Sequence, residues 1–330
     1  MSPASVPKRL RSLLRRAWPG APEAAPVELS QRRIYVMPTI SGLAFASVLG
    51  VMLLASINYG LSLGYAFSFL LVGIGIASAI HAFRNLLRLS IRYGRSEDAF
   101  CGGSAVFHLL VDNPDARRRP ALRLIGGDAP GLCGETRFDL PPKGCGDIAL
   151  ALPARQRGMM PIGRTVIETR WPLGFVRAWS VFIPDMEALV FPAPELDPPP
   201  PPPGQGGNST NRGAARIGNE DFAGLRAYRD TDSLHHLAWK VFARSGAVMT
   251  KQFSDIGDAD LFFDWRLLPA AFPDEARLSR LAAWLLRAEQ SGQCYALWLP
   301  GHEFPPGRGE THLYCCLAAL ALHGGKAGKT

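Results

Sequence analysis

The segment IYVMPTISGLAFASVLGVMLLASINYGLSLGYAFSFLLVGIGIASAIHAF, residues 34–83, decides the architecture of this chain. Its 50 residues include no Asp, Glu, Lys or Arg. One helix that crosses a bilayer needs about 20 apolar residues, so this segment is long enough for two such helices and a tight turn. We expect helices at about 39–57 and 61–82, with the reversal at Asn58, Tyr59 and Gly60.

Positive charge lies at both outer ends of this apolar segment, and the expected turn carries none. The flanking cations are Lys8, Arg9, Arg11, Arg15, Arg16, Arg32 and Arg33 before it, and Arg84, Arg88, Arg92 and Arg95 after it. The positive-inside rule therefore predicts a two-pass hairpin over residues 34–95 with both termini in the cytoplasm. A buried hairpin of a soluble protein is the alternative. A cleaved signal peptide is disfavoured because the apolar part starts late and continues into a second helix.

The distribution of charge argues against a nucleic-acid partner. The chain has a formal net charge of +8, but residues 1–95 hold 11 Lys and Arg against 2 acids. Residues 96–330 hold 25 basic and 26 acidic side chains. A nucleic-acid binder should carry its positive charge on its binding domain. The excess belongs instead to the basic tail, residues 1–33, and to the flanks of the hairpin.

The six cysteines do not predict a metal site. None forms a C-x-x-C pair, and none has a histidine at zinc-ligand spacing. A cytoplasmic location predicts reduced thiols. Cys316 falls on the apolar face of an expected helix, where core packing explains it best. We expect no cofactor.

Residues 96–195 have the pattern of a β-sandwich-like domain. Short β-prone runs occur at 105–111, 122–125, 147–152 and 165–169, separated by turns rich in Gly, Pro and Asn. Such spacing is typical of antiparallel sandwiches. No catalytic constellation is visible in this part of the chain.

A run of six prolines, Pro198 to Pro203, precedes a Gly, Ser and Asn stretch. This composition predicts a linker over residues 196–215. A ligand for a proline-recognition domain is the alternative interpretation.

Residues 216–330 change to an α/β pattern. Asp274 can cap a helix whose apolar face carries Leu278, Leu281, Leu285 and Ala288. Strands are expected at 261–263 and 295–299, and a last helix carries Leu313, Cys316, Leu317 and Leu320. Strand, helix, strand, helix implies parallel pairing of the strands. The chain is therefore predicted to be an α+β multidomain protein: a transmembrane hairpin, a β-sandwich-like domain and a small α/β domain.

The densest chemistry lies between residues 218 and 254, where charged and aromatic side chains interleave. The candidate motif residues are Asp221, Phe222, Arg226, Tyr228, Asp232, Trp239, Lys240 and Arg244. They could form an ionic network that fixes a loop-rich region, or a recognition surface anchored by Arg and aromatic side chains. A hydrolase is disfavoured because Asp232, Ser233 and His235 lack a G-x-S-x-G elbow. Neither dinucleotide nor phosphate-loop glycine patterns are present.

At these residues the chain resembles the membrane-anchored bacterial family called domain of unknown function fifty-eight. The resemblance is carried by Asp221-Phe222, Leu225-Arg226, Tyr228, Asp232, Trp239-Lys240, Ala243-Arg244 and Lys251. It extends to Arg32-Arg33 with Met37-Pro38-Thr39, to Arg84-Asn85-Leu86, to Trp171-Pro172-Leu173-Gly174-Phe175 and to Phe191-Pro192.

The resemblance implies a C-terminal region related to the von Willebrand factor A fold, truncated here. It also implies a bacterial inner membrane and, as partners, a MoxR-type AAA+ ATPase and a transglutaminase-like membrane protein. Two positions depart from the family pattern. Thr231 stands where the family usually has glycine, and Asp264 is followed by Trp265 and Arg266 rather than by the serines of a metal site. We therefore interpret Asp264 as the remnant of a lost metal site.

Three functions are compatible with these observations. The first, which we favour, is a non-enzymatic scaffold or adaptor whose cytoplasmic domains dock a protein partner through the motif residues. The second is a membrane-associated enzyme of cell-envelope or protein maturation with an unidentified active site. The third is a purely structural membrane protein.

Overall fold

A computed structural model describes residues 21–127, 133–201, 222–227, 249–253, 261–269 and 271–324, with the backbone alone described for 222–227 and 249–253. The fold is mixed α+β. Contacts divide the chain into two compact units: Met1–Ala193 with Ala321–Thr330, and Pro194–Leu320. We call them the β unit and the α/β unit and describe each by itself.

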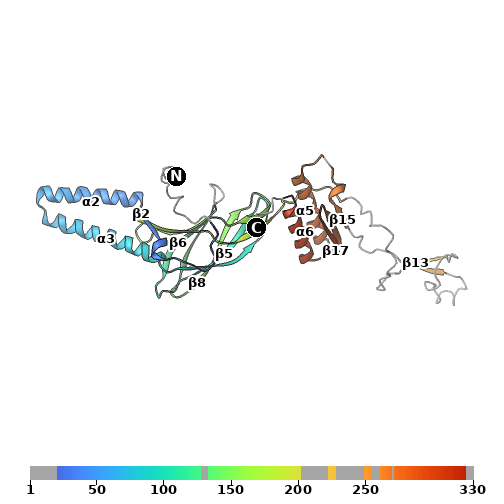
Figure 1. Ribbon diagram of the computed structural model, residues 1–330, viewed down its shortest axis with the longest axis horizontal. Helices are drawn as coiled ribbons and strands as arrows, with labels where there is room; N and C mark the ends of the chain where they lie inside the picture. The colour runs from blue at the N-terminus through green and yellow to red at the C-terminus, as the bar shows by residue number, and fades with distance from the viewer. Residues whose placement is uncertain are drawn as a thin grey trace. The chain divides into compact units, whose positions relative to one another are not determined.

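Two long helices form a hairpin at the start of the β unit (Figure 1). Helix α2 is Ile40–Tyr59 and helix α3 is Ser62–Leu86, and both are long and apolar enough to cross a membrane. The Thr39 hydroxyl caps α2 by accepting from the Gly42 N–H at 3.1 Å. Gly60 ends α2 with a φ of 63°, a conformation that glycine adopts without strain. The two predicted helices are confirmed, and α3 runs four residues beyond the predicted end. The chain reverses at Gly60 and Leu61, because Asn58 and Tyr59, which were predicted in the turn, are the last residues of α2.

Three sheets build the rest of the β unit. The four-stranded sheet has the order β1-β3-β5-β8, with bounds Val27–Glu28, Ser90–Glu97, Ser104–Asp112 and Cys145–Pro153. The five-stranded sheet has the order β2-β11-β10-β6-β7, with bounds Tyr35–Pro38, Val176–Phe182, Thr165–Thr169, Arg119–Gly126 and Gly134–Leu140. The three-stranded sheet has the order β4-β12-β9, with bounds Ala99–Phe100, Glu187–Phe191 and Gly158–Pro161. The four- and five-stranded sheets are antiparallel throughout.

The two larger sheets share one apolar core. Alternate side chains of β5, such as Phe107 and Leu109, are fully buried, as period-2 patterning requires. Leu124 on β6 and Ile167 on β10 complete the core from the other sheet. Each of the four β-prone runs predicted from the sequence is a strand.

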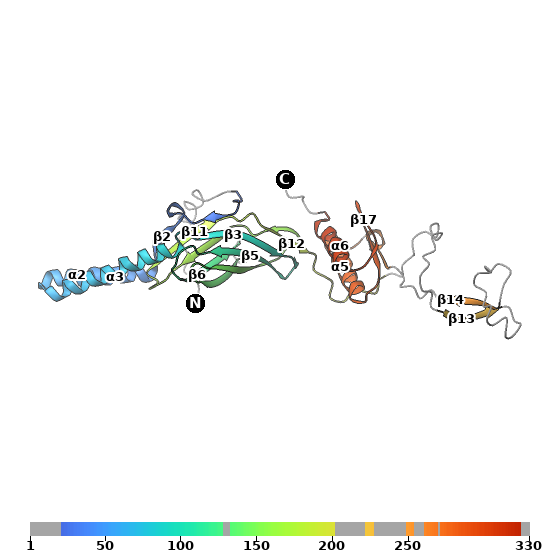
Figure 2. The ribbon, with the colours of Figure 1, turned by 90° about the horizontal axis from the view of Figure 1, so that it is seen from below.

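The α/β unit contains a three-stranded sheet with two helices on one face (Figures 1 and 2). Strand β15, Leu261–Asp264, pairs in parallel with β16, Tyr295–Leu299, and helix α5, Asp274–Gln290, connects them. The predicted parallel pair and its helical crossover are thereby confirmed. Helix α6, Glu310–Leu322, follows.

Two details of the α/β unit differ from the sequence prediction. Strand β17, His302–Gly307, was not expected, and it pairs antiparallel with β16. Its two prolines, Pro305 and Pro306, suit an edge strand because they have no N–H to donate. Asp274 is the first residue of α5 rather than its cap, and Pro273 occupies the N-cap position. The acidic side chain still favours the positive end of the helix dipole.

Candidate functional site

Most of the predicted motif residues lie outside the part of the chain that the structure describes. This holds for Asp221, Tyr228, Asp232, Trp239, Lys240 and Arg244. Phe222 and Arg226 lie on strand β13, Phe222–Ala227, which pairs antiparallel with β14, Met249–Phe253. The ladder sets Arg226 opposite Thr250 and Leu225 opposite Lys251. Residues from both ends of the motif therefore meet in one two-stranded ladder.

Asp264 is described, and its carboxylate is fully engaged by Arg266. Both carboxylate oxygens accept hydrogen bonds from the guanidinium at 2.9–3.1 Å, and one oxygen also accepts the Arg266 N–H at 2.8 Å. The guanidinium in turn lies over the Trp298 ring, 3.8 Å from its centroid. Arg266 therefore neutralises the charge of the Asp264 carboxylate that a metal ion would need.

A polar cluster beneath helix α6 contains a cysteine and a histidine but is arranged for packing. His312 Nε2 lies 3.1 Å from the Tyr295 carbonyl oxygen and 3.8 Å from the Cys316 sulfur. A carbonyl oxygen only accepts, so Nε2 carries a proton and does not act as a base toward the thiol. The Tyr295 hydroxyl donates to Glu289 at 2.9 Å, and Glu289 also accepts the Gly309 N–H at 3.1 Å. This network fixes β16, α5 and α6 together.

Neighbouring cysteines on α6 are expected to differ sharply in reactivity. Cys316 is fully buried, and burial raises the pKa of its thiol to about 12, whereas Cys315 is exposed. At about pH 8 a thiol with that pKa is thiolate in about one molecule in ten thousand. Iodoacetamide should therefore modify Cys315 and spare Cys316 in the folded protein, and denaturant should make both react, as peptide mass spectrometry can measure. Equal modification of the two in the folded protein would contradict the buried position of Cys316.

The first residues of the predicted linker are bound to helix α5. Trp284 Nε1 donates to the Pro199 carbonyl at 2.7 Å, and Arg287 donates to the Pro198 carbonyl at 3.1 Å. Just before them, Glu195 forms a bidentate pair with Arg280 at 2.8 and 3.0 Å, which lowers the pKa of Glu195. The start of the proline run is therefore part of the α/β unit. The remainder of the predicted linker, from residue 202, lies outside the described residues.

A contact of hydrogen bonds and stacked rings joins the helical hairpin to the sheets, and we call it the membrane joint. It comprises Thr39, Gly42 and Phe45 of the α2 end, His81 and Asn85 of α3, and the β10–β11 loop, residues 171–175. The Thr39 hydroxyl lies 2.6 Å from the Gly174 carbonyl, and the Thr39 N–H donates to the Phe175 carbonyl at 2.9 Å. The Phe175 ring stacks on Phe45 with centroids 4.3 Å apart. Gly42 permits the approach, because an added Cβ would lie 2.0 Å from the Phe175 oxygen.

The second half of the joint is the end of α3, which enters the core of the β unit. Ala82 and Leu86 are fully buried there. Between them, Asn85 is 4% exposed and its amide donates to the Pro120 carbonyl at 2.8 Å and to the Thr169 hydroxyl at 3.1 Å. A buried amide with two partners fixes the helix in rotation as well as in depth. The hairpin and the sheets are therefore one packed structure.

A row of charged and aromatic side chains crosses the five-stranded sheet next to the joint. Strand register places Tyr35, Trp179, Glu168, Arg123 and Arg137 side by side on successive strands. Glu168 is 1% exposed and pairs with Arg177, with Arg123 at 3.4 Å and with Arg170 at 4.0 Å. Arg177 also lies over the Trp179 ring at 5.0 Å. We call these residues the Glu168 row. The row links β2, the strand that precedes α2, to β10 at the centre of the sheet.

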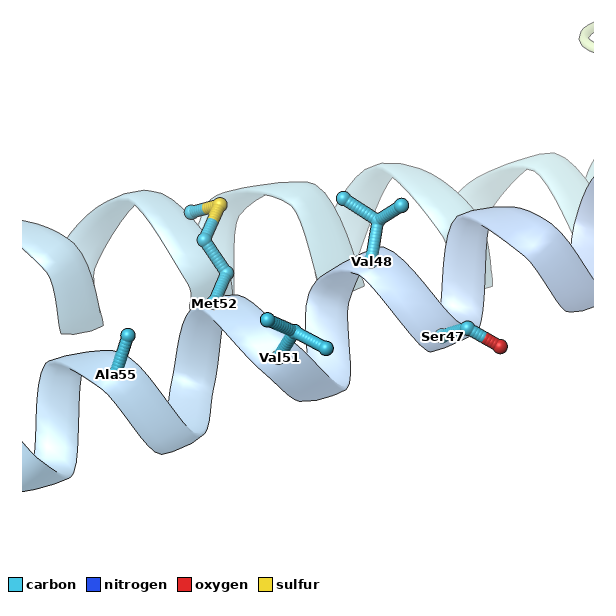
Figure 3. A pocket seen from close by; sticks show the side chains of 5 residues that line it. All are labelled: Ser47, Val48, Val51, Met52 and Ala55. Atoms are coloured by element: carbon cyan, nitrogen blue, oxygen red, sulfur yellow. The ribbon is translucent and has the colours of Figure 1, made fainter.

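Two hollows in the β unit do not define a ligand. A shallow apolar one of about 430 Å³ lies on α2 and is lined by Ser47, Val48, Val51, Met52 and Ala55, whose side chains Figure 3 shows. Its apolar lining suits lipid chains. A groove of about 680 Å³ is lined in part by Glu28, Arg88, Asp112 and Lys143. Charges of both signs line this groove and select neither an anion nor a cation.

No family model matches the chain, and no curated protein matches it. The resemblance named above stays a prediction that depends on the quoted residues. In the described residues, no group of three or more His, Cys, Asp or Glu is placed to hold a metal ion. Residues 171–175 and Asn85 belong to the family resemblance, but the sequence pattern predicts no contact between them. The sequence feature that indicates this joint is a polar residue, Asn85, at the end of an apolar helix.

Proposed function

We propose that this protein is a membrane-anchored, non-enzymatic scaffold or adaptor. Its hairpin inserts into the bacterial inner membrane with both termini in the cytoplasm, and its cytoplasmic domains dock a protein partner. A hairpin returns the chain to the side from which it came, and arginines such as Arg33 and Arg84 flank the two outer ends. The positive-inside rule then favours the cytoplasmic side for everything outside the hairpin.

The observation that carries the proposal is the membrane joint. A protein that needs only an anchor can use a helix and a loose tether. Here the second helix ends inside the β unit, where Asn85 makes two buried hydrogen bonds and Leu86 is fully buried. Breaking such a joint leaves buried polar groups without partners, at about 1–3 kcal/mol for each group. The β unit is thereby held at a fixed angle to the membrane, which is the property expected of a scaffold.

The docking surface in this proposal is the motif between residues 218 and 254. Its two described strands, β13 and β14, place the backbones of Arg226 and Lys251 in one two-stranded ladder. The partner we propose is a MoxR-type AAA+ ATPase, together with a transglutaminase-like membrane protein, as the family resemblance implies. The Cys316 and His312 pair is built as a packing contact and does not support the enzyme alternative.

Affinity capture of the full-length protein from native membranes tests this proposal. Wild type is compared with Arg226→Glu and Trp239→Ala, and mass spectrometry identifies any co-purifying ATPase. We expect both substitutions to remove the ATPase, because Arg and Trp are the side chains that most often anchor interfaces, at 2 kcal/mol or more each, a factor of about 30 in affinity.

Arg308→Glu is the matched control, because Arg308 is an exposed arginine of the same unit outside the motif. It should retain the ATPase. Limited proteolysis of each variant must show the wild-type pattern for the comparison to count. An ATPase that binds all four proteins equally would show that the motif is architectural and would remove the docking half of the proposal.

A further inference from the structure

We propose that the β10–β11 loop, residues 171–175, inserts into the membrane interface and acts as a third lipid-contacting element beside the two helices. The partner of this surface is the lipid bilayer. The inference rests on the membrane anchor of the proposed function. It adds that a loop between two strands of the five-stranded sheet also lies at membrane depth.

The length of α2 sets the first constraint on depth. Its 20 residues span about 30 Å, which equals the thickness of a hydrocarbon core of about 30 Å. The helix has no turn to spare, so its first residues must lie at the membrane boundary. The loop packs against those residues, because the Phe175 carbonyl accepts the Thr39 N–H and the Phe175 ring stacks on Phe45. If the membrane began after Phe45, the remaining helix would span about 20 Å, which is too short.

Helix α3 gives a second and independent measure of the same depth. Of its last residues, Ala82, Asn85 and Leu86 are buried in the β unit and cannot lie in lipid. The part from Ser62 to His81 is then the membrane span, and it is also about 30 Å long. The His81 ring meets the Trp171 ring edge-on at 5.8 Å. Both helices therefore reach the membrane boundary at the level of the loop.

The exposed side chains of the loop have the chemistry of a lipid interface. Trp171 is 37% exposed and Leu173 is 50% exposed, and the neighbouring Met37 of β2 is 41% exposed. Trp is enriched where the apolar core of a membrane meets its headgroups. Exposed cations flank these residues: Arg84 in the last turn of α3, and Arg170 directly before the loop. Arginines at that level can meet lipid phosphates while apolar side chains enter the acyl region.

Several backbone polar groups of the loop have protein partners. Irregular backbone at membrane depth is tolerated where its polar groups have protein partners. The Trp171 N–H donates to the Thr169 hydroxyl at 3.2 Å, and the Gly174 N–H donates to the Arg170 carbonyl at 2.8 Å. Pro172 has no N–H. The Gly174 and Phe175 carbonyls accept from Thr39.

The exposed side chains of the loop contact lipid rather than a second protein, because they continue the exposed apolar surface of the hairpin. Ile40 and Leu43, the first apolar residues of α2, are 72% and 56% exposed, so the exposed apolar surface of the helix begins where the loop lies. A protein partner seated on the loop would have to enter the bilayer to reach it. The bilayer that surrounds the helices covers Trp171 and Leu173 without any further component.

Photocrosslinking of the full-length protein in phosphatidylcholine and phosphatidylglycerol vesicles tests the inference. A photoactivatable phenylalanine analogue is placed, one site at a time, at Leu173, at Val51 in the middle of α2, and at Met159 on β9. All three positions are at least half exposed, at 50%, 69% and 51%, so the analogue does not disturb the core. We expect lipid adducts at Leu173 comparable with those at Val51, and none at Met159, as measured by mass spectrometry of the intact protein.

Each other outcome is decisive. Lipid adducts at Val51 without any at Leu173 would overturn the inference and leave the membrane anchor standing. A protein adduct at Leu173, from a second copy of the chain, would overturn it in favour of a protein interface. The absence of lipid adducts at both Val51 and Leu173 would overturn the inference together with the anchoring half of the proposed function. Adducts at all three positions would show non-specific lipid contact and would also overturn it.

Discussion

Glu168→Ala is expected to destabilise the β unit by about 3 kcal/mol, which corresponds to a fall of about 6–12 °C in the thermal midpoint. Glu168 is 1% exposed and is the carboxylate that Arg123, Arg170 and Arg177 share. Removing one partner of a buried ion pair costs about 3–5 kcal/mol when the remaining charge stays buried. The side chains of these arginines are 29–58% exposed, so water offsets part of the loss and places the effect at the lower end. Thermal unfolding in detergent micelles measures it.

Glu135→Ala is the matched control for this prediction. Glu135 meets Arg123 at 3.3 Å on the same face of the same sheet, but its side chain is 40% exposed. An exposed ion pair contributes about 0–1 kcal/mol, so its loss should move the midpoint by a few degrees at most. Equal shifts for the two alanine variants would contradict the assignment of Glu168 as the buried centre of the row. Glu168→Gln should fall between them, because it keeps the shape and removes the charge.

The pattern of apolar residues predicted the elements of this protein more accurately than their contacts. The charge-free run of 50 residues predicted α2, α3 and the turn at Gly60, because no soluble element needs so long a run without charge. The strand at 165–169 was predicted at its observed bounds. Strand β17 was missed because Pro305 and Pro306 argue against a strand unless it lies at an edge, and edge position is a property of the whole sheet.

The Glu168 row shows why the site could be predicted only in part. Arg123, Glu168 and Trp179 are separated by 45 and 11 residues along the chain, and only the strand register brings them side by side. The same holds for Asn85 and its partners Pro120 and Thr169. Local patterns report which face of an element is apolar, but they do not report which strands pair. The motif at 218–254 was found by local crowding of charge, and for that reason its partners could not be inferred.

Gly42→Ala is expected to destabilise the membrane joint by about 3 kcal/mol, the upper end of the range for an inserted methyl group. The new Cβ would lie 2.0 Å from the Phe175 carbonyl oxygen and 2.9 Å from its carbonyl carbon. Both are backbone atoms, so no side-chain rotation relieves the clash. Either α2 or the β10–β11 loop must move, and the hydrogen bonds from Thr39 to Gly174 and Phe175 lengthen with it. Limited proteolysis should then show new cleavage within residues 170–176, where we expect the wild-type protein to resist it.

Gly50→Ala is the same substitution on the same helix without the clash, since nothing lies within 4 Å of an added Cβ there. It should be neutral or slightly stabilising, because alanine favours a helix over glycine by about 0.5–1 kcal/mol. The pair separates a general effect of altering α2 from loss of the joint. If Gly42→Ala left both the cleavage pattern and the thermal midpoint unchanged, the loop would not be fixed to the start of α2, and the depth assigned to residues 171–175 would fail with it. If Gly42→Ala exposes the loop to protease while Gly50→Ala does not, the close contact at Gly42 is what holds the sheets against the membrane hairpin.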